Sequence, residues 1–229
     1  MAVPLPGIVR MGLVRRLPSL TPDEFGDHWR GPHGTLASVM PGLIRYQQNH
    51  VVESFGVEGL RDEWQLDGLS ELWFDSLGTM EKAIASASYS NLAQDTPKVM
   101  TLPGVIAGTQ EAAAEDRGRD APLHKAMVVV GRRKDLSLDE FLGSWRQVSL
   151  DIVASGGAAS LVNTIVTHRE GEPGQRVPYE SLPIDVVMEV WFEDLDQLRH
   201  CLGATLDGAL AGVVANASLY RVETHVIVP

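Results

Sequence analysis

Cysteine is almost absent from this sequence, with Cys201 as the single example among 229 residues. One cysteine cannot form an intrachain disulfide, and it excludes a metal cluster held by several thiolates. The sequence also lacks an apolar run long enough to cross a bilayer, and its first residues lack an apolar core of signal-peptide length. These absences predict a cytoplasmic protein without a membrane partner.

Basic residues are scarce relative to acidic ones, with 19 Lys and Arg against 30 Asp and Glu and a formal net charge of −11. Long-range repulsion then disfavours nucleic acids, anionic membrane surfaces and polyphosphate substrates. Glycine-rich nucleotide-binding motifs and the GxSxG motif of serine hydrolases are also missing. Aromatic residues make up only 6%, but 44% hydrophobic residues are enough for a folded chain. The expected partner is a small apolar or aromatic molecule.

An internal repeat organises the sequence. The segment LTPDEFGDHWRGPHG from Leu20 reappears as LSLDEFLGSWRQVSL from Leu136, an offset of 116 residues. A second pair, DGLSELWF from Asp67 and DVVMEVWF from Asp185, follows at an offset of 118. Because order and spacing are preserved, we interpret the chain as a tandem duplication.

Periodicity within the first repeat predicts the order strand, helix, strand, strand, helix, strand. A capping box formed by Thr21 and Glu24 indicates where the first helix begins, and Pro41 with Gly42 ends it. The predicted elements of this unit are strands at residues 8–16, 43–53, 66–75 and 105–109, with helices after Thr21 and near Ser76.

The order βαββαβ is that of a ferredoxin-like unit, in which two helices cover one face of a four-stranded antiparallel sheet. The other sheet face is apolar, and a second copy can cover it. We therefore predict an α+β fold of two tandem ferredoxin-like units, residues 1–110 and 124–229, with a polar linker at 111–123. Together they would form an intramolecular dimeric α/β-barrel, and its further assembly into a homo-oligomer is left open.

The first unit resembles the EthD domain of the dimeric α/β-barrel superfamily. The resemblance rests on DEFGDHWRGPHG from Asp23, PGLIRYQQNHV at 41–51 and ELWF at 71–74. The second unit is similar to a diverged copy, which retains Phe141, Trp145, Arg146 and Trp191. The resemblance implies a fused pseudo-dimer with a small-molecule pocket between helices and sheet. It does not fix a reaction, because relatives include cofactor-free monooxygenases, haem-dependent enzymes, isomerases, cyclases and dehydratases.

The two copies differ in their polar residues. His28 aligns with Ser144, His33 with Ser149, Tyr46 with Val162 and His50 with Val166. Either the first unit holds a site that the second has lost, or the scaffold performs no chemistry and the second copy has simply diverged.

Geometry selects the candidates within the first unit. His33 falls within ~40° of Trp29 on a helix and should face inward, beside a kink caused by Pro32. Strand alternation places Tyr46 and His50 on the face that we expect to lie against the helices. Imidazole titrates near neutral pH and a phenol can donate to a developing oxyanion, so this trio could perform acid–base chemistry.

We therefore predict His33, Tyr46 and His50 as catalytic. The predicted substrate-binding residues are His28, Trp29, Arg30, Gln48, Asn49, Leu72 and Trp64, the last in a long loop that could act as a lid. Asp95 in AQDTPKVM faintly resembles the family's aspartate after the second helix. Each histidine could instead be a core residue bonded to a carbonyl, and Arg30 an ion-pair partner of a helix carboxylate.

No metal is expected, because His28 and His33 do not have the i, i+4 spacing that places two ligands on one helix face. No cofactor is expected either, although haem is left open. The favoured function is a cofactor-independent oxidoreductase of the monooxygenase type that acts on an apolar or aromatic substrate. A lyase, isomerase or dehydratase using the same residues, and a non-catalytic, stress-responsive ligand-binding protein, are the alternatives.

Overall fold

The computed structural model describes residues 2–56, 60, 63–114, 123–154, 157–172, 174–202 and 212–229. The elements of the first half are β1 (Val3–Pro4), β2 (Ile8–Arg16), α1 (Pro22–His28), the π-helical turn η1 (Trp29–His33), α2 (Gly34–Ser38), β3 (Arg45–Phe55), β4 (Gly68–Phe74), α3 (Leu77–Ile84), α4 (Ala87–Asp95), η2 (Thr96–Lys98) and β5 (Met100–Ala114). Those of the second half are β6 (His124–Arg132), α5 (Leu138–Ala154), β7 (Ala158–Glu172), β8 (Gln175–Arg176), η3 (Tyr179–Ser181), β9 (Val186–Phe192), α6 (Leu195–His200) and β10 (Val214–Val228).

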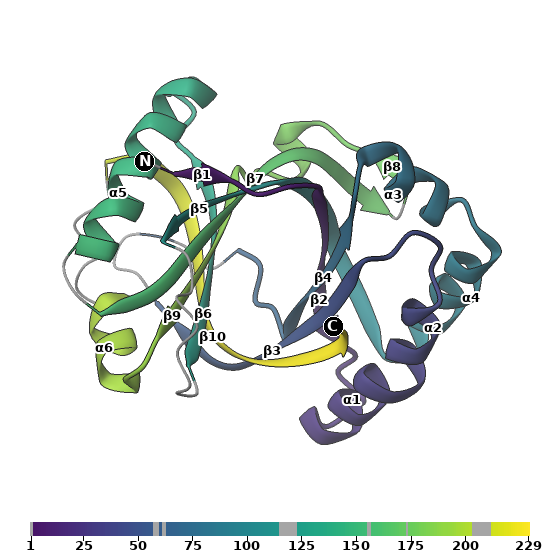
Figure 1. Ribbon diagram of the computed structural model, residues 1–229. Helices are drawn as coiled ribbons and strands as arrows, with labels where there is room; N and C mark the ends of the chain where they lie inside the picture. Colours follow the sequence, from purple (N-terminus) through teal and green to yellow (C-terminus); the bar gives the residue numbers. More distant parts are fainter. Residues whose placement is uncertain are drawn as a thin grey trace.

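Among the described residues, eight strands close into an antiparallel barrel. The strand order is β5-β2-β4-β3 in the first half and β10-β6-β9-β7 in the second, with β1 and β8 added at the edges. Two seams join the halves, because β3 pairs with β10 and β5 pairs with β7. Figure 1 shows α1 to α4 on one side of the barrel and α5 and α6 on the other. The predicted α+β barrel with external helices is therefore confirmed.

The last strand of the first half is longer than predicted and enters the segment predicted as a linker. Strand β5 continues to Ala114, where Ala112 pairs with Val162 of β7 on one edge and with Val3 of β1 on the other. Pairing on both edges satisfies the backbone of this polar segment, which has no apolar alternation to mark it as a strand. Residues 115–122 of the predicted linker lie outside the described residues.

Local signals set the first helix as predicted. The Thr21 side chain accepts the Glu24 backbone N–H, and the Glu24 carboxylate accepts the Thr21 N–H at 2.8 Å. Ser137 and Glu140 repeat this capping box in the second half. Pro32 has no backbone N–H, and the helix passes through it as the π-helical turn η1 instead of a regular turn. That turn directs the inward side chains of the site described below.

The barrel interior holds an apolar cluster to which both halves contribute, including Met11, Leu13, Met127 and Val129. Trp64 belongs to this cluster, and its carbonyl accepts the Arg15 Nε–H at 2.6 Å. The expectation that Trp64 lies on a pocket lid is thus corrected. Its large ring is buried in the barrel interior, where it packs with the other apolar side chains. Among the described residues, no helix combines the length and the hydropathy needed to cross a bilayer.

Charged groups are also buried inside the barrel. Lys125 Nζ lies 2.6 Å from Glu189 Oε2 and 3.1 Å from Glu71 Oε2. Asn49 donates to Glu71 at 2.7 Å and accepts from Lys125 at 3.0 Å. Asn49, which was predicted as a substrate contact, therefore lies in the barrel interior and does not line the cavity described below, because alternation along β3 turns its side chain away from the helices.

Candidate active site

A cavity of about 40 Å³ lies between the helices and the sheet of the first half. Its apolar walls include Trp29, Leu72 and Leu92. The polar residues that line it are Arg10, His33, Tyr46, Ser70, Tyr89 and Thr96. Four of the residues predicted from sequence, His33, Tyr46, Trp29 and Leu72, thus meet around one space. The other six predicted residues do not line it.

His33 forms a hydrogen-bonded pair with Asp95. Its Nδ1 lies 3.1 Å from Asp95 Oδ2, and both side chains are more than nine-tenths buried. A carboxylate accepts the Nδ1–H, which leaves Nε2 of the neutral ring with its lone pair. Burial lowers the pKa of His33, and the bond to Asp95 only partly opposes this. His33 is therefore neutral at neutral pH and able to take up a proton.

Asp95, at the end of α4, is hydrogen-bonded to three side chains that carry or can carry a positive charge. His28 Nε2 lies 3.1 Å from Oδ2, and Lys98 Nζ lies 3.2 Å from Oδ1. Burial alone would raise the pKa of Asp95, but the hydrogen bonds from His28, His33 and Lys98 outweigh it and lower the pKa. Asp95 therefore stays ionised and orients His33. His28, with 31% of its side chain exposed, reaches Asp95 from the solvent side and not the cavity.

Tyr46 is fixed by two neighbouring side chains. Its hydroxyl accepts the Gln48 Nε2–H at 2.7 Å and is also hydrogen-bonded to the Trp29 side chain. Gln48 Nε2 donates to the Trp29 carbonyl of the π-helical turn at 2.6 Å as well, so Gln48 ties strand to helix. Burial raises the pKa of Tyr46. The phenol is therefore neutral, and an oxygen that accepts from two donors keeps its own O–H for another partner.

His50 does not line the cavity that His33 and Tyr46 share. Its ring centroid lies 4.4 Å from that of Trp29 and 4.7 Å from that of His225, outside the cavity. Burial, and then the charges of His225 and Arg30, lower the pKa of His50 to about 3. The face of β3 was predicted correctly, but four residues of strand carry His50 about 13 Å beyond Tyr46. Periodicity gives the face of a strand and not the position of the cavity along it.

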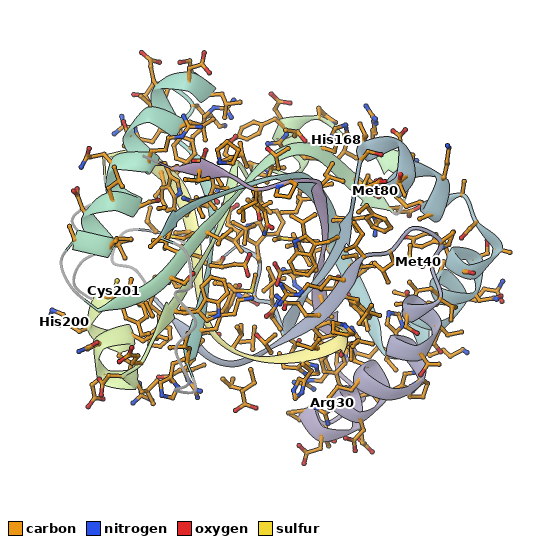
Figure 2. All side chains as sticks on the ribbon, viewed as in Figure 1. Arg30, Met40, Met80, His168, His200 and Cys201 are labelled. Atoms are coloured by element: carbon orange, nitrogen blue, oxygen red, sulfur yellow. The ribbon has the colours of Figure 1, made fainter. Side chains whose placement is uncertain are left out.

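Arg30 lies at the outer surface of the helical layer, as labelled in Figure 2. Its Nη2 donates to Asp27 Oδ1 at 2.6 Å. The ion pair with a helix carboxylate that the sequence suggested for Arg30 is thus present, and Arg30 does not line the cavity. Cys201 lies near α6 on the opposite side of the molecule (Figure 2).

The sequence analysis did not predict Arg10, a buried arginine that lines the cavity. Arg10 of β2 donates from Nη2 to Glu170 Oε2 at 2.8 Å and to the Tyr89 hydroxyl at 3.2 Å. The available signal was an arginine on the strand face opposite Val9 and Met11. Glu170 could not have been found in this way, because it belongs to β7 of the second half.

The corresponding region of the second half is closed by its own hydrogen bonds. Trp145 Nε1 donates to Asn163 Oδ1 at 2.9 Å, and Asn163 Nδ2 donates to Ser149 Oγ at 3.0 Å. Ser149 is the residue that aligns with His33 when the two halves of the sequence are compared. Among the residues that the structure describes, no group of histidine, cysteine and acidic side chains is arranged to hold a metal ion.

Comparison with solved structures shows the same architecture at low identity. An anthrone oxidase-like protein is 12% identical with a TM-score of 0.62, over 96% of this chain and 92% of that one. A dye-decolorizing peroxidase from Bacteroides thetaiotaomicron is 9% identical with a TM-score of 0.55, over 96% of each chain. A protein named as a monooxygenase from Fusobacterium nucleatum subsp. nucleatum is 9% identical with a TM-score of 0.53. The match covers 98% of this chain and 94% of that one.

A search of curated proteins finds no match to this sequence. The family model for the EthD domain matches residues 17–103, the stretch that contains η1, His33, Tyr46 and Asp95. The resemblance noted in the sequence is thus confirmed for residues 17–103, which match the EthD family model.

Proposed function

We propose that this protein is a cofactor-independent oxidoreductase of the monooxygenase type that acts on an aromatic substrate, with His33 as its general base. The observation that carries the proposal is the buried His33–Asp95 pair on a cavity that Trp29 and Leu72 also line. A neutral imidazole oriented by a carboxylate is an arrangement suited to proton abstraction. Tyr46, whose O–H remains available to donate, acts as the acid toward the substrate oxygen on which negative charge develops.

The reaction begins with transfer of a proton from substrate carbon to His33 Nε2. The most suitable carbon is a methylene group flanked by aromatic rings and conjugated to a carbonyl, since its anion places charge on oxygen. That anion reduces dioxygen without a cofactor. In the overall balance the CH₂ group becomes C=O, one oxygen atom enters the substrate, and the other leaves as water with the two hydrogens. The substrate supplies all four electrons.

The comparisons support this choice at the level of reaction class. The similar structures carry names of oxidoreductases, among them an anthrone oxidase-like protein, a monooxygenase and a dye-decolorizing peroxidase. Because identities of 9 to 12% establish the fold alone, the substrate and reaction assigned here rest on the His33 site.

The size of the cavity constrains both substrate and cofactor. Ligand pockets usually enclose about 300–1,000 Å³, whereas this cavity of about 40 Å³ holds only a few water molecules. Binding of a ring system therefore requires displacement of lining side chains on α4, such as Leu92. A haem macrocycle is larger than a tricyclic substrate, and the residues around His33 leave too little space to hold it.

The direct test is oxygen consumption with anthrone as substrate. We expect purified protein to consume one dioxygen per anthrone converted to the quinone, and His33→Gln to lose this activity by about 10²- to 10⁴-fold at an unchanged melting temperature. His28→Gln is the matched control, because His28 contacts the same carboxylate without lining the cavity. Full activity of a folded His33→Gln variant would refute the proposed role.

A lyase, isomerase or dehydratase is the second candidate, because His33 and Tyr46 can transfer protons without oxygen. Turnover of a carbonyl substrate under argon would favour it. Saturable binding without turnover in either atmosphere would favour a ligand-binding protein.

The same proposal extends to the architecture. We infer that residues 1–110 and 124–229 are two copies of one ferredoxin-like unit. The equivalent strand orders, the repeated capping boxes at Thr21 and Ser137, and the matched tryptophans Trp29 and Trp145 support this duplication.

A further inference from the structure

Arg10 brings an incompletely paired guanidinium to the cavity. Its side chain is only 6% exposed and lines the cavity together with His33 and Tyr46. Among the described residues, its Nε–H has no hydrogen-bond acceptor. A buried charged donor without a partner is costly, and native structures usually provide such a donor with a ligand or water.

The orientation of Arg10 is fixed from the other half of the chain. Glu170 on β7 accepts from Arg10 Nη2 at 2.8 Å and from the Gly174 backbone N–H at 2.9 Å, so its carboxylate is itself anchored. It reaches Arg10 across the seam between β5 and β7. Tyr89 accepts a second bond from Nη2, and the centroid of its ring lies 5.4 Å from the guanidinium carbon.

This arrangement selects the kind of group that Arg10 can bind. The Nε and Nη2 edge of an arginine can hold a carboxylate or phosphate through two parallel bonds. Here Nη2 already donates to Glu170 and Tyr89. On this edge the Nε–H is the one donor left, which suits a single oxygen atom and disfavours an anion that needs two donors side by side.

We propose that Arg10 Nε binds the carbonyl or phenol oxygen of the substrate as that oxygen becomes negatively charged, and that Glu170 of the second half is the positioning residue for Arg10. This inference rests on the proposed function, in which His33 removes the proton that creates the charge. It identifies the substrate class as hydroxyaromatic compounds or aromatic ketones that form a phenolate or enolate. It also makes the site dependent on both halves of the barrel.

The test uses 4-nitrophenol, whose neutral and ionised forms absorb at different wavelengths. At a pH below the pKa of the free phenol, we expect the wild-type protein to bind the probe with an increase in the phenolate absorption. Arg10→Gln should weaken phenolate binding at least tenfold. Arg10→Lys keeps the charge but not the Nε–H, so we expect it to recover only part of the affinity.

Glu170 is tested by removal and by conservative replacement. Glu170→Ala frees Arg10 and should weaken phenolate binding about tenfold. Glu170→Gln keeps an oxygen that accepts from Arg10 and should restore most of the binding. Arg169→Gln is the matched control, because Arg169 is the preceding residue of β7 but donates to the carbonyls of Leu182 and Ile184. We expect wild-type binding from that variant.

Several results would overturn the inference. These are failure of the wild-type protein to bind 4-nitrophenol, wild-type affinity in a folded Arg10→Gln variant, or equal loss of binding in Glu170→Ala and Glu170→Gln. If Arg10→Gln does not fold, wild-type affinity in Arg10→Lys has the same meaning.

The outcomes separate this inference from the proposed oxidase activity. Anthrone oxidation that survives Arg10→Gln overturns the role of Arg10 and leaves the activity intact. Arg10-dependent binding of 4-nitrophenolate by a protein that never consumes oxygen supports the anion site and overturns the oxidase.

Discussion

Glu71 and Glu189 are hydrogen-bonded to each other inside the barrel, one from each half of the chain. Both carboxylates also contact Lys125. Burial and the charge of Glu71 raise the pKa of Glu189 to about 8. Burial would also raise the pKa of Glu71, but Lys125 and the surrounding hydrogen bonds lower it. Glu189 therefore keeps its proton at neutral pH and donates it to Glu71, so the cluster holds one negative and one positive charge.

The shared proton makes stability depend on pH. Because the pKa of Glu189 is raised on folding, the native state binds more protons than the unfolded state, and stability falls as pH rises through the folded pKa. Between pH 7 and 8 we expect the free energy of unfolding to fall by about 1 kcal/mol per pH unit, as measured by urea denaturation. Glu189→Gln should remove this dependence, whereas the exposed Glu172→Gln should retain it. An unchanged slope in Glu189→Gln would contradict the shared proton.

The pH dependence of activity should report His33. Burial lowers the pKa of His33, so the neutral base persists below its ordinary value of 6.5. We expect kcat/KM to be constant near neutrality and to fall only as pH drops below this value. Asp95→Asn removes the partner that favours protonation and orients the ring, and should lower kcat by about 10²-fold or more. A rate that rises on acidification would show that His33 acts as an acid instead.

Trp29 should constrain the strand beneath it at Gly68. A Cβ at Gly68 would lie 2.4 Å from Trp29 Cζ3 and 2.9 Å from the Asn49 carbonyl oxygen. Gly68→Ala should therefore destabilise the protein by about 1–3 kcal/mol and displace the tryptophan from the cavity wall. Thermal unfolding and tryptophan fluorescence would measure both effects.

Gly78 offers the matched control for that substitution. It lies in α3, and no heavy atom lies within 4 Å of the Cβ that Ala would add. Gly78→Ala should stabilise the protein by about 0.4–1 kcal/mol, because alanine restricts the unfolded chain and favours helix. Equal destabilisation by the two substitutions would show that contact with Trp29 is not the cause of the Gly68 effect.

The two halves should unfold together. Both seams of the barrel and the Lys125–Glu71 ion pair join them, so neither half keeps a complete core alone. We expect hydrogen exchange to show that the amides of Leu13 in β2 and Val129 in β6 lose protection at the same denaturant concentration. Independent opening of residues 124–229 at low denaturant would contradict a shared core.

Local patterns in the sequence determined the elements and their inward faces. The capping boxes, the alternation of Met11 and Leu13, and the inward position of His33 depend on residues a few positions apart. Helix and strand periods fix such relationships whatever the rest of the chain does. The similarity between the two halves of the sequence also predicted the barrel, because a second sheet like the first could cover its apolar face.

Tertiary structure alone decided which of these residues meet. His33 and Asp95 are 62 positions apart, and Arg10 and Glu170 are 160 positions apart. Contacts over such separations depend on strand register and on the closure of the β5–β7 seam, which no local period encodes. The same cause separates His50 from the cavity and places Asn49 and Trp64 in the barrel. The sequence thus determined the direction of each side chain, and the closed barrel determined its partner.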